Sequence, residues 1–394
     1  MSIHYLDNSA TTEPSKAAKR ALTESLDTFG NPSSVHSPGV AAHNLLESCR
    51  AAVSAALGLR RMNGSRLVFT SSGTEANCLA ILGYHASKDR LRGGRRPVVI
   101  VGDGEHPSVS EPMLRLEGVG YKVVKIPTVG GELDFDALRE ALDGASGRVI
   151  FAEFMLVNNE TGALYDVRRA ASLIHSAYPD AHVHCDAVQA FMKTKFSPIS
   201  LGVDSLTVSA HKIHAPRGAA ALWLSAETVK KKNIAPVLPG GGQEGGLRSG
   251  TENLAAIAAF AAACEDEKAH FEENISRVSE LRERLDRAML GMGGSGVVIK
   301  EPVKHIPNIV NITLPRIKSE TMLNYLSGRG IYVSAGSACS ASAGRLSPAL
   351  AAFGCSDTEI DSSLRVSLSH TNNEEDIDAF VSALADGINF LARF

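Results

Sequence analysis

Long apolar runs are missing from this 394-residue sequence, and none reaches the roughly 18 residues that a membrane-spanning helix needs. The first residues lack a basic segment followed by an apolar one, the pattern of a secretory signal, so we expect a cytoplasmic protein without a membrane partner. Neither charge sign dominates, since 40 Lys and Arg face 43 Asp and Glu, for a formal net charge of −3. This near-balance argues against a protein that binds nucleic acid through bulk positive charge.

Paired cysteines and internal repeats are missing too. The six cysteines are scattered and form no CxxC pair, which excludes a disulfide scaffold and favours a reducing compartment. No low-complexity segment occurs, and the contents of 44% hydrophobic and 21% charged residues are typical of globular proteins. At roughly 150 residues per domain, the length predicts two or three domains.

Short apolar runs alternate with helical patterns through the first two thirds of the chain. Apolar residues recur at helical spacing in 135–143 and 167–178. The alternation predicts an α/β fold with a mostly parallel sheet and helices on both faces, in which ligands bind at the carboxyl ends of the strands. The predicted buried strands are 67–70, 98–101, 122–126, 149–154, 182–186, 206–209 and 220–224.

The pattern changes at the glycine-rich segment 236–250, which a long helical stretch from about Asn253 to Met292 follows. We therefore predict a large domain over residues 15–252 and a smaller α/β domain made of residues 1–14 and 253–394. The smaller domain is expected to hold the segments 309–314, 331–345 and 364–369, a loop at about 334–346 that contains Cys339, and a closing helix to Phe394.

Two strand ends and one helix start carry the first candidate site. Ser72 and Glu75 fit a capping box, and the exposed N–H groups of a helix start bind anions, although an ordinary helix cap explains the pattern as well. Asp186 ends an apolar strand, where a carboxylate needs a cationic or hydrogen-bonding partner. Lys212 follows another strand, where a desolvated lysine can form a Schiff base. In this order, a phosphate cradle, an Asp and a Lys are what pyridoxal phosphate requires.

A metal site is the alternative reading of the histidines near these strand ends. A tetrahedral zinc site usually shows clearer ligand pairs, so paired structural histidines are favoured and no metal site is predicted. The residues of that alternative are His182, His184, Cys185, Asp186, His211 and His214.

Cys339 lies in a run of Ser, Ala and Gly without bulky neighbours. Such a segment favours a reachable thiol on an exposed, mobile loop over a small buried residue.

Together these segments resemble the cysteine desulfurases of the NifS/IscS type, in the class V aminotransferase group of fold-type I pyridoxal-phosphate enzymes. The resemblance covers nearly the whole chain, because ten motifs occur in the family's order. They are YLDNSATT (5–12), FGNPSS (29–34), FTSSGTEAN (69–77), EHPSV (105–109), VNNETG (157–162), DAVQA (186–190), SAHKIHAPRG (209–218), GGGQEGGLRSGTEN (240–253), GSACS (336–340) and SSLRVSLS (362–369).

The resemblance implies roles for matching residues. Lys212 would be the Schiff-base lysine, His106 would stack on the ring and transfer protons, and Cys339 would accept the substrate sulfur. Arg365 and Asn159 would bind the substrate carboxylate, and a planar guanidinium suits that task. Asn31 is a further expected substrate-binding residue. The other expected cofactor-binding residues are Gly73, Thr74, Asn159, Asp186, Gln189, Ser209, His211 and Thr251, the last reaching the phosphate of the neighbouring subunit.

The implied reaction converts L-cysteine to L-alanine and leaves a persulfide on Cys339. The implied enzyme is a homodimer with shared active sites, and it passes sulfur to an acceptor protein for iron–sulfur cluster assembly or tRNA thiolation. Relatives of the IscS type carry a further C-terminal tail that docks the scaffold protein, whereas this sequence ends at LARF, so another acceptor or another docking surface is expected. Selenocysteine lyase and another aminotransferase-type activity are the alternatives on the same fold.

Overall fold

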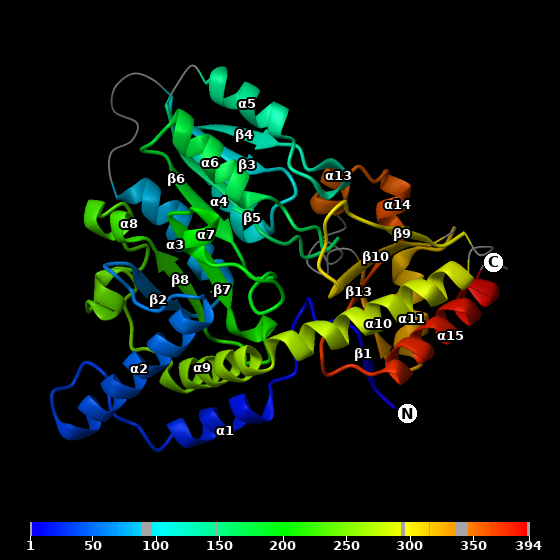
Figure 1. Cartoon of the computed structure of the whole chain (residues 1–394), viewed down its shortest axis with the longest axis horizontal. Coiled ribbons are helices and arrows are strands. Elements are labelled where there is room, and N and C mark those ends of the chain that lie inside the picture. Colours follow the sequence, from blue (N-terminus) through cyan, green and yellow to red (C-terminus); the bar gives the residue numbers. More distant parts are fainter. Residues whose placement is uncertain are drawn as a thin grey trace.

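The computed structural model describes residues 2–87, 96–145, 148–292, 296–314, 316–335 and 346–391. A seven-stranded sheet forms the centre of its larger part (Figure 1). Its strands are β2 (Arg66–Thr70), β3 (Val98–Gly102), β4 (Lys122–Ile126), β5 (Val149–Met155), β6 (His182–Asp186), β7 (Ser205–Ser209) and β8 (Ala220–Leu224). They lie in the order β2-β8-β7-β6-β5-β3-β4, and β8 alone runs antiparallel to its neighbours. All seven predicted strands are therefore confirmed.

Alternate side chains of each strand enter two different cores, because successive residues point to opposite faces of a sheet. On β2, Val68 packs beneath α3 (Gly73–Ala86) and α4 (Pro107–Gly118), whereas Leu67 and Phe69 face the opposite core. The helices of that opposite core are α1 (Lys16–Ser25), α2 (Ser37–Ala56), α5 (Phe135–Asp143), α6 (Val167–Ala177) and α9 (Leu254–Ala269). The sheet thus has helices on both faces, as predicted.

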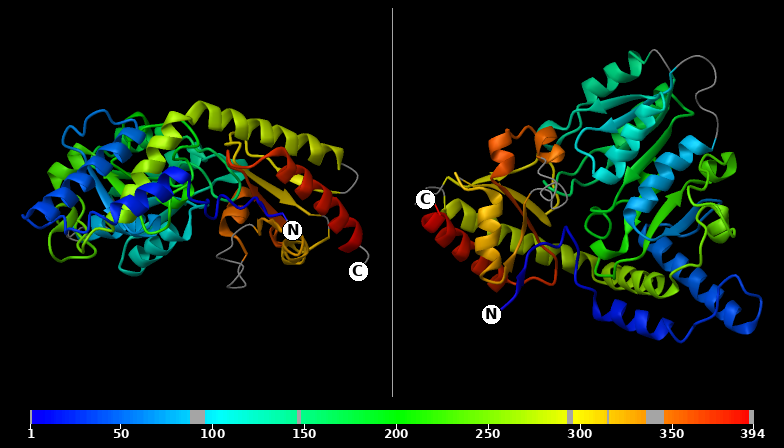
Figure 2. Two further views of the ribbon diagram at one scale, coloured as in Figure 1. Left: turned by 90° about the horizontal axis from the view of Figure 1, so that it is seen from below. Right: turned by 180° about the vertical axis from the view of Figure 1, so that it is seen from behind.

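A smaller unit with its own apolar core adjoins the large sheet (Figure 2). Its four-stranded sheet has the order β12-β13-β10-β9, and β1 pairs in parallel with β11 beside it. Its elements are β1 (His4–Tyr5), α10 (Phe271–Gly291), β9 (Val298–Lys300), β10 (Ile309–Thr313), α11 (Ser319–Ser327), β11 (Ile331–Tyr332), β12 (Ser334–Ala335), β13 (Ser363–Ser367) and α15 (Glu374–Leu391).

The helix expected from Asn253 to Met292 is interrupted at His270, which separates α9 from α10. The buried side chains of α9 belong to the core of the large sheet, and those of α10 belong to the second core. Because α9 packs against one core and α10 against the other, the helix breaks between them at His270. The predicted domain boundaries, at residues 14/15 and 252/253, stay predictions.

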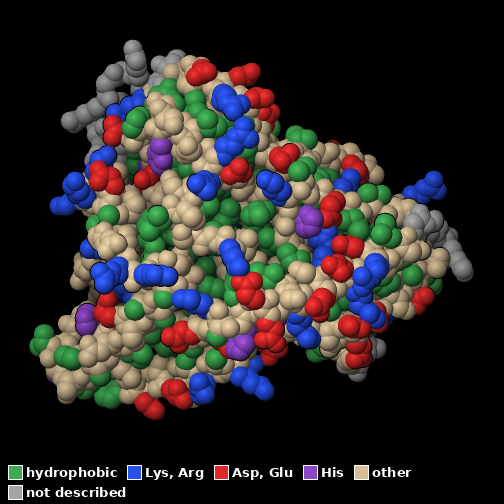
Figure 3. Space-filling view, in the orientation of Figure 1, with side chains coloured by type: hydrophobic (Ala, Val, Ile, Leu, Met, Phe, Trp, Pro, Cys, Tyr) green, Lys and Arg blue, Asp and Glu red, His purple; other side chains and the backbone are tan. Residues whose placement is uncertain are grey.

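Short helices complete the fold. They are α7 (Pro198–Leu201), α8 (Ala226–Lys231), α13 (Pro348–Phe353) and α14 (Asp357–Asp361), with 3-10 turns η1 (Val129–Gly131), η2 (Ala210–Lys212) and η3 (Gln243–Gly246). Lys, Arg, Asp and Glu side chains are interspersed on the face shown in Figure 3, in keeping with the near-neutral net charge. None of the helices in the described ranges combines the length and the apolar character that crossing a membrane requires.

Candidate active site

A cavity of about 340 Å³ opens where the carboxyl ends of β2, β3, β5, β6 and β7 meet the N-terminal loop and β13. Ten of the residues predicted from the sequence line it, although they come from six separate segments. They are Gly73, Thr74, His106, Asn159, Asp186, Gln189, Ser209, His211, Lys212 and Arg365. This cavity is therefore the candidate active site.

The start of α3 forms one end of the cavity. Ser72 Oγ accepts a hydrogen bond from Glu75 N at 3.1 Å, as a capping residue does. The Glu75 carboxylate, however, accepts from the N–H and hydroxyl of Ser71 rather than from Ser72 N, so half of the predicted capping box is formed. Arg248 Nε donates to Glu75 Oε1 at 2.8 Å and ties the glycine-rich segment to this helix. Burial alone would raise the pKa of Glu75, but the hydrogen bonds from Arg248 and Ser71 lower it.

The same end of the cavity suits a phosphate group. A Cβ atom on Gly73 would lie 3.1 Å from Val188 Cγ2, so a side chain there would crowd the entrance to the helix. Ser209 Oγ is buried and has no hydrogen-bond partner within the described residues, which leaves a donor for a ligand. Backbone N–H groups at a helix start and a buried hydroxyl together bind anions.

Asp186 lies at the end of β6 and faces the middle of the cavity. Its carboxylate accepts hydrogen bonds from Asn77 Nδ2 at 2.7 Å and Val188 N at 2.9 Å. Burial raises the pKa values of the neighbouring Glu105 and Glu153 well above their usual range, and the negative charge of Asp186 adds to this for both. Because both glutamic acids are held protonated, Asp186 is suited to face a cationic ring nitrogen.

His106 is the capping residue of α4 and lies at the side of the cavity. Ser108 N donates to His106 Nδ1 at 3.1 Å, and Ser108 Oγ lies 2.8 Å from the same atom. A backbone N–H can only donate, so the neutral ring carries its proton on Nε2. Burial, together with Lys212, lowers the pKa of His106 despite the opposing effect of Asp186. A neutral imidazole that donates from Nε2 follows from these contacts.

Lys212 lies in the turn after β7 and directs its amino group toward the N-terminal loop. Its Nζ donates to Ser9 O at 2.6 Å and to Ala10 O at 2.7 Å. Gln189 Nε2 also donates to Ser9 O, at 2.9 Å, so the loop that contains Ser9 joins the two side chains. The motif YLDNSATT (5–12) contains this loop, but the sequence alone did not indicate that Ser9 O would accept hydrogen bonds from Lys212 and Gln189.

Lys193 is a half-buried neighbour that the sequence did not indicate as a site residue. Its Nζ donates to Gln189 Oε1 at 2.9 Å, and desolvation lowers its pKa to about 7. Its position four residues after Gln189 is visible in the sequence, but nothing there indicates that its amino group is withdrawn from water.

Arg365 on β13 closes the cavity from the smaller unit. Its guanidinium donates to Asp7 Oδ1 at 2.8 Å and to Asn159 O at 3.1 Å. Arg365 Nε is buried and lacks a hydrogen-bond partner within the described part of the chain. A guanidinium that two hydrogen bonds fix in place, and whose Nε–H is still available as a donor, is suited to bind a carboxylate.

The remaining histidines of the predicted motifs divide into two groups. His182 and His184 both contact Ser205 Oγ, at 2.7 and 2.8 Å, and Phe151 stacks on the ring of His182. These are structural contacts, as favoured from the sequence. His211 lines the cavity beside Thr11, and burial and the charge of Lys212 lower its pKa to about 3.

Three predicted site residues are not among those that line the cavity. Thr251 and Asn31 are exposed in the single chain, and their expected roles stay predictions. Cys339 lies outside the described residues.

Comparisons with known proteins agree on one family. Residues 4–380 match the model of the aminotransferase class-V family. The chain is 34% identical over 388 residues to the cysteine desulfurase of Trichormus azollae, a match that covers 98% of this chain and 93% of that protein. The structure of a NifS-like protein from Rickettsia africae ESF-5 is similar, with a TM-score of 0.87, 31% identity and coverage of 98% of this chain and 100% of that one. The structure of SspA in complex with cysteine has a TM-score of 0.77 at 25% identity and covers 93% of this chain and 98% of that one.

Proposed function

The chain belongs to the class-V aminotransferase family and is a pyridoxal-phosphate-dependent cysteine desulfurase, and we propose that the cavity around Lys212 is its active site. The observation that carries this proposal is the convergence of ten predicted residues, from six segments, on one cavity. The family relation supplies the expected residues, and the geometry supports the proposal because these residues lie around one cavity.

The cofactor would be held by groups that the cavity already orients. Gly73, Thr74 and Ser209 would bind the phosphate, Asp186 the ring nitrogen, and Lys212 the aldehyde carbon. Gln189 would hydrogen-bond the ring hydroxyl. When bound, pyridoxal phosphate supplies an electron sink for the bond that breaks at the substrate α-carbon. The unpartnered Ser209 hydroxyl and the two contacts that fix Asp186 support this assignment.

The substrate is L-cysteine, whose carboxylate would bind to Arg365 and Asn159. Once substrate has taken its place, Lys212 Nζ is positioned to remove the α-proton, since its amino group reaches into the same cavity. His106 would donate a proton from Nε2, because Ser108 N occupies Nδ1. Such a donor neutralises negative charge that develops beside the ring.

Sulfur transfer is assigned to Cys339 on the sequence motif alone. The Cys339 thiolate attacks the substrate sulfur, an S–S bond forms, and the C–S bond of the substrate breaks with its electron pair going to carbon. Protonation of that carbon completes L-alanine. The products are L-alanine and a persulfide on Cys339, and no external oxidant is needed.

We propose a homodimer in which Thr251 of each subunit reaches the other subunit's site. Support comes from the exposure of Thr251 in the single chain and from its place directly after the glycine-rich segment that Arg248 ties to α3. An iron–sulfur scaffold protein or a thiolation enzyme would accept the sulfur. The cytoplasmic location stays a prediction from the sequence.

Lys212→Ala tests the active-site assignment, with Lys195→Ala as the matched control. Lys195 lies outside the cavity and pairs with Glu272 on the surface. We expect Lys212→Ala to lose alanine formation from L-cysteine and the visible absorption of a lysine-bound cofactor, while Lys195→Ala keeps both. Wild-type turnover by Lys212→Ala would refute the assignment.

A further inference from the structure

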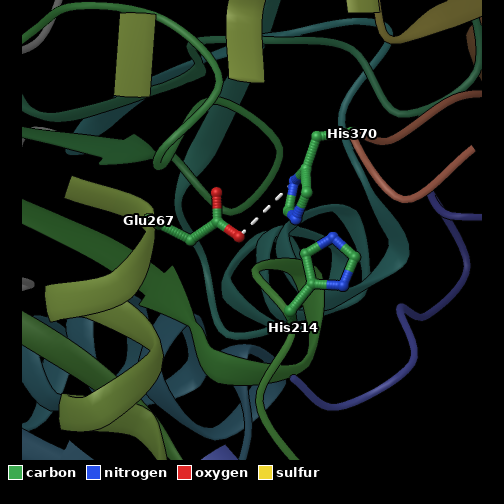
Figure 4. A group of neighbouring side chains, drawn as sticks. All are labelled: His214, Glu267 and His370. Carbon is green, nitrogen blue, oxygen red and sulfur yellow. Dashed lines mark ion pairs between the residues drawn. The ribbon is translucent and has the colours of Figure 1, made fainter. Parts of the chain in front are cut away.

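Three side chains that metals commonly bind meet outside the proposed active site (Figure 4). His214 follows β7 two residues after Lys212, Glu267 lies in the last turn of α9, and His370 lies in the loop between β13 and α15. One possible ligand atom from each lies within 4.8 Å of the others. We propose that His214, Glu267 and His370 form a Zn²⁺ site whose fourth position is open to water.

The chemistry and spacing of this cluster suit zinc. Two histidines and one carboxylate, with water as the fourth ligand, are an established zinc ligand set. Tetrahedral ligands at about 2.0–2.1 Å from zinc lie roughly 3.4 Å apart. His370 Nδ1 already lies 3.6 Å from Glu267 Oε1. The ligand atom of His214 lies within 4.8 Å of the other two, and a bound ion would draw it closer to them.

The three residues line a small cavity that can hold an ion. Its volume is about 30 Å³, whereas one water needs roughly 10–15 Å³. His214 and Glu267 are buried, with exposed fractions of 4% and 7%. There is room for one ion together with a bound water.

Neighbouring groups orient the proposed ligands. His214 Nδ1 lies 2.9 Å from Glu13 O, and because a carbonyl only accepts, Nδ1 carries the proton and Nε2 presents its lone pair. Asn274 Nδ2 donates to Glu267 Oε2 at 3.0 Å and fixes that carboxylate. His214 also has a φ of 61°, a left-handed conformation that is costly for a residue other than glycine. These contacts hold His214 and Glu267 in place for metal binding.

Two lysines line the same cavity and direct their amino groups toward the active site. Lys193 Nζ donates to Gln189, and Lys212 Nζ donates to Ser9 and Ala10. Their charge weakens cation binding but does not occupy the position between the three ligands. The site therefore predicts binding by a transition metal with strong imidazole affinity rather than by Mg²⁺ or Ca²⁺.

A metal here would join the two units of the fold. Glu267 lies on a helix of the large-sheet core, His214 lies in the loop that follows Lys212, and His370 leads from β13 into α15. Bound Zn²⁺ would cross-link the Lys212 loop to the smaller unit and stabilise the folded chain, since the metal binds the assembled site alone.

Isothermal titration of the purified holoenzyme with ZnCl₂ tests the proposal, after N-ethylmaleimide has blocked the thiols that would otherwise take metal. We expect one Zn²⁺ per chain, at least tenfold weaker binding in both His370→Gln and Glu267→Gln, and a Zn²⁺-dependent rise in thermal midpoint that both variants lose. His270→Gln, which changes a partly exposed histidine three residues after Glu267, should bind as the wild type does. The cofactor absorption of each variant reports whether it is folded, independently of metal binding. Less than one Zn²⁺ per chain in the wild type, or wild-type affinity in folded His370→Gln, would overturn the proposal.

Discussion

Replacing Arg365 by Lys tests how the cavity recognises its substrate. Two nitrogens of the guanidinium are held by Asp7 and by Asn159 O, and Nε is buried without a partner in the described ranges. A lysine places one ammonium group there and cannot match both oxygens of a carboxylate. If Arg365 binds the substrate carboxylate as proposed, the substitution removes at least one charge-assisted hydrogen bond to L-cysteine.

The size of the effect follows from that bond. A hydrogen bond to a charged group contributes about 1.5–3 kcal/mol, and each 1.4 kcal/mol is a factor of ten. We expect kcat/KM for L-cysteine to fall by about 10- to 150-fold in Arg365→Lys. Steady-state alanine formation measures this change.

Two comparisons separate substrate binding from general damage. Cysteamine lacks the carboxylate, so spectral titration of the cofactor with cysteamine should give the same affinity in Arg365→Lys and in the wild type. Arg282→Lys changes another buried arginine with acidic partners, Asp286 and Glu301, that does not line the cavity, and it should leave KM unchanged. Equal losses for cysteine and cysteamine would refute the carboxylate assignment.

Three other substitutions probe the cofactor site and the core. Asp186→Asn should retain bound cofactor but lower kcat at least 100-fold, because a neutral amide no longer favours a protonated ring nitrogen. Rapid-mixing spectroscopy and alanine formation measure this change. An unchanged kcat would show that Asp186 does not pair with the ring nitrogen. Ser209→Ala should weaken pyridoxal-phosphate binding by about 5- to 15-fold, the loss of one hydrogen bond of about 1–1.5 kcal/mol, in a titration of the apo-protein. Burial lowers the pKa of His184 to about 3, so the unfolded chain binds more protons below about pH 6.5 and stability falls as the pH falls. Between pH 7 and pH 5 this one group accounts for about 2 kcal/mol of lost stability, and urea unfolding of His184→Gln should show a pH dependence smaller by that amount.

The fold could be predicted from the sequence because most of its strands are short runs dominated by apolar residues. Strands 98–102 and 220–224 are buried at every position, and their ends fall where the apolar pattern ends. The break at His270 could not be predicted in this way. Helical spacing continues across it, and the break arises because α9 and α10 pack into different cores.

The residue types of the candidate site and their order along the chain could be predicted from the sequence, but the contacts between their side chains could not. The order of the Gly73, Asp186 and Lys212 motifs indicated a cofactor, and the structure brings all three to one cavity. The partial burial of Lys193 and the link from Ser9 to Lys212 depend on tertiary packing. No local pattern in a single sequence reports such packing.

The cluster of His214, Glu267 and His370 could not be predicted from the sequence either. The sequence pattern drew attention to His214 as one of several histidines near a strand end. Its partners, Glu267 and His370, lie 53 and 156 positions further along the chain, and no motif links them. Only the packing of α9 and the loop after β13 brings them together.

Mass spectrometry of the holoenzyme after incubation with L-cysteine, without reductant, tests whether Cys339 accepts the substrate sulfur. We expect the peptide containing Cys339 to gain one sulfur atom while L-alanine forms in equal amount. Cys339→Ser should lose both products and keep the cofactor absorption, whereas Cys78→Ser, which changes a partly buried thiol outside the cavity, should behave as the wild type does. Undiminished catalytic alanine formation by Cys339→Ser, or a persulfide on another cysteine, would refute sulfur transfer through Cys339.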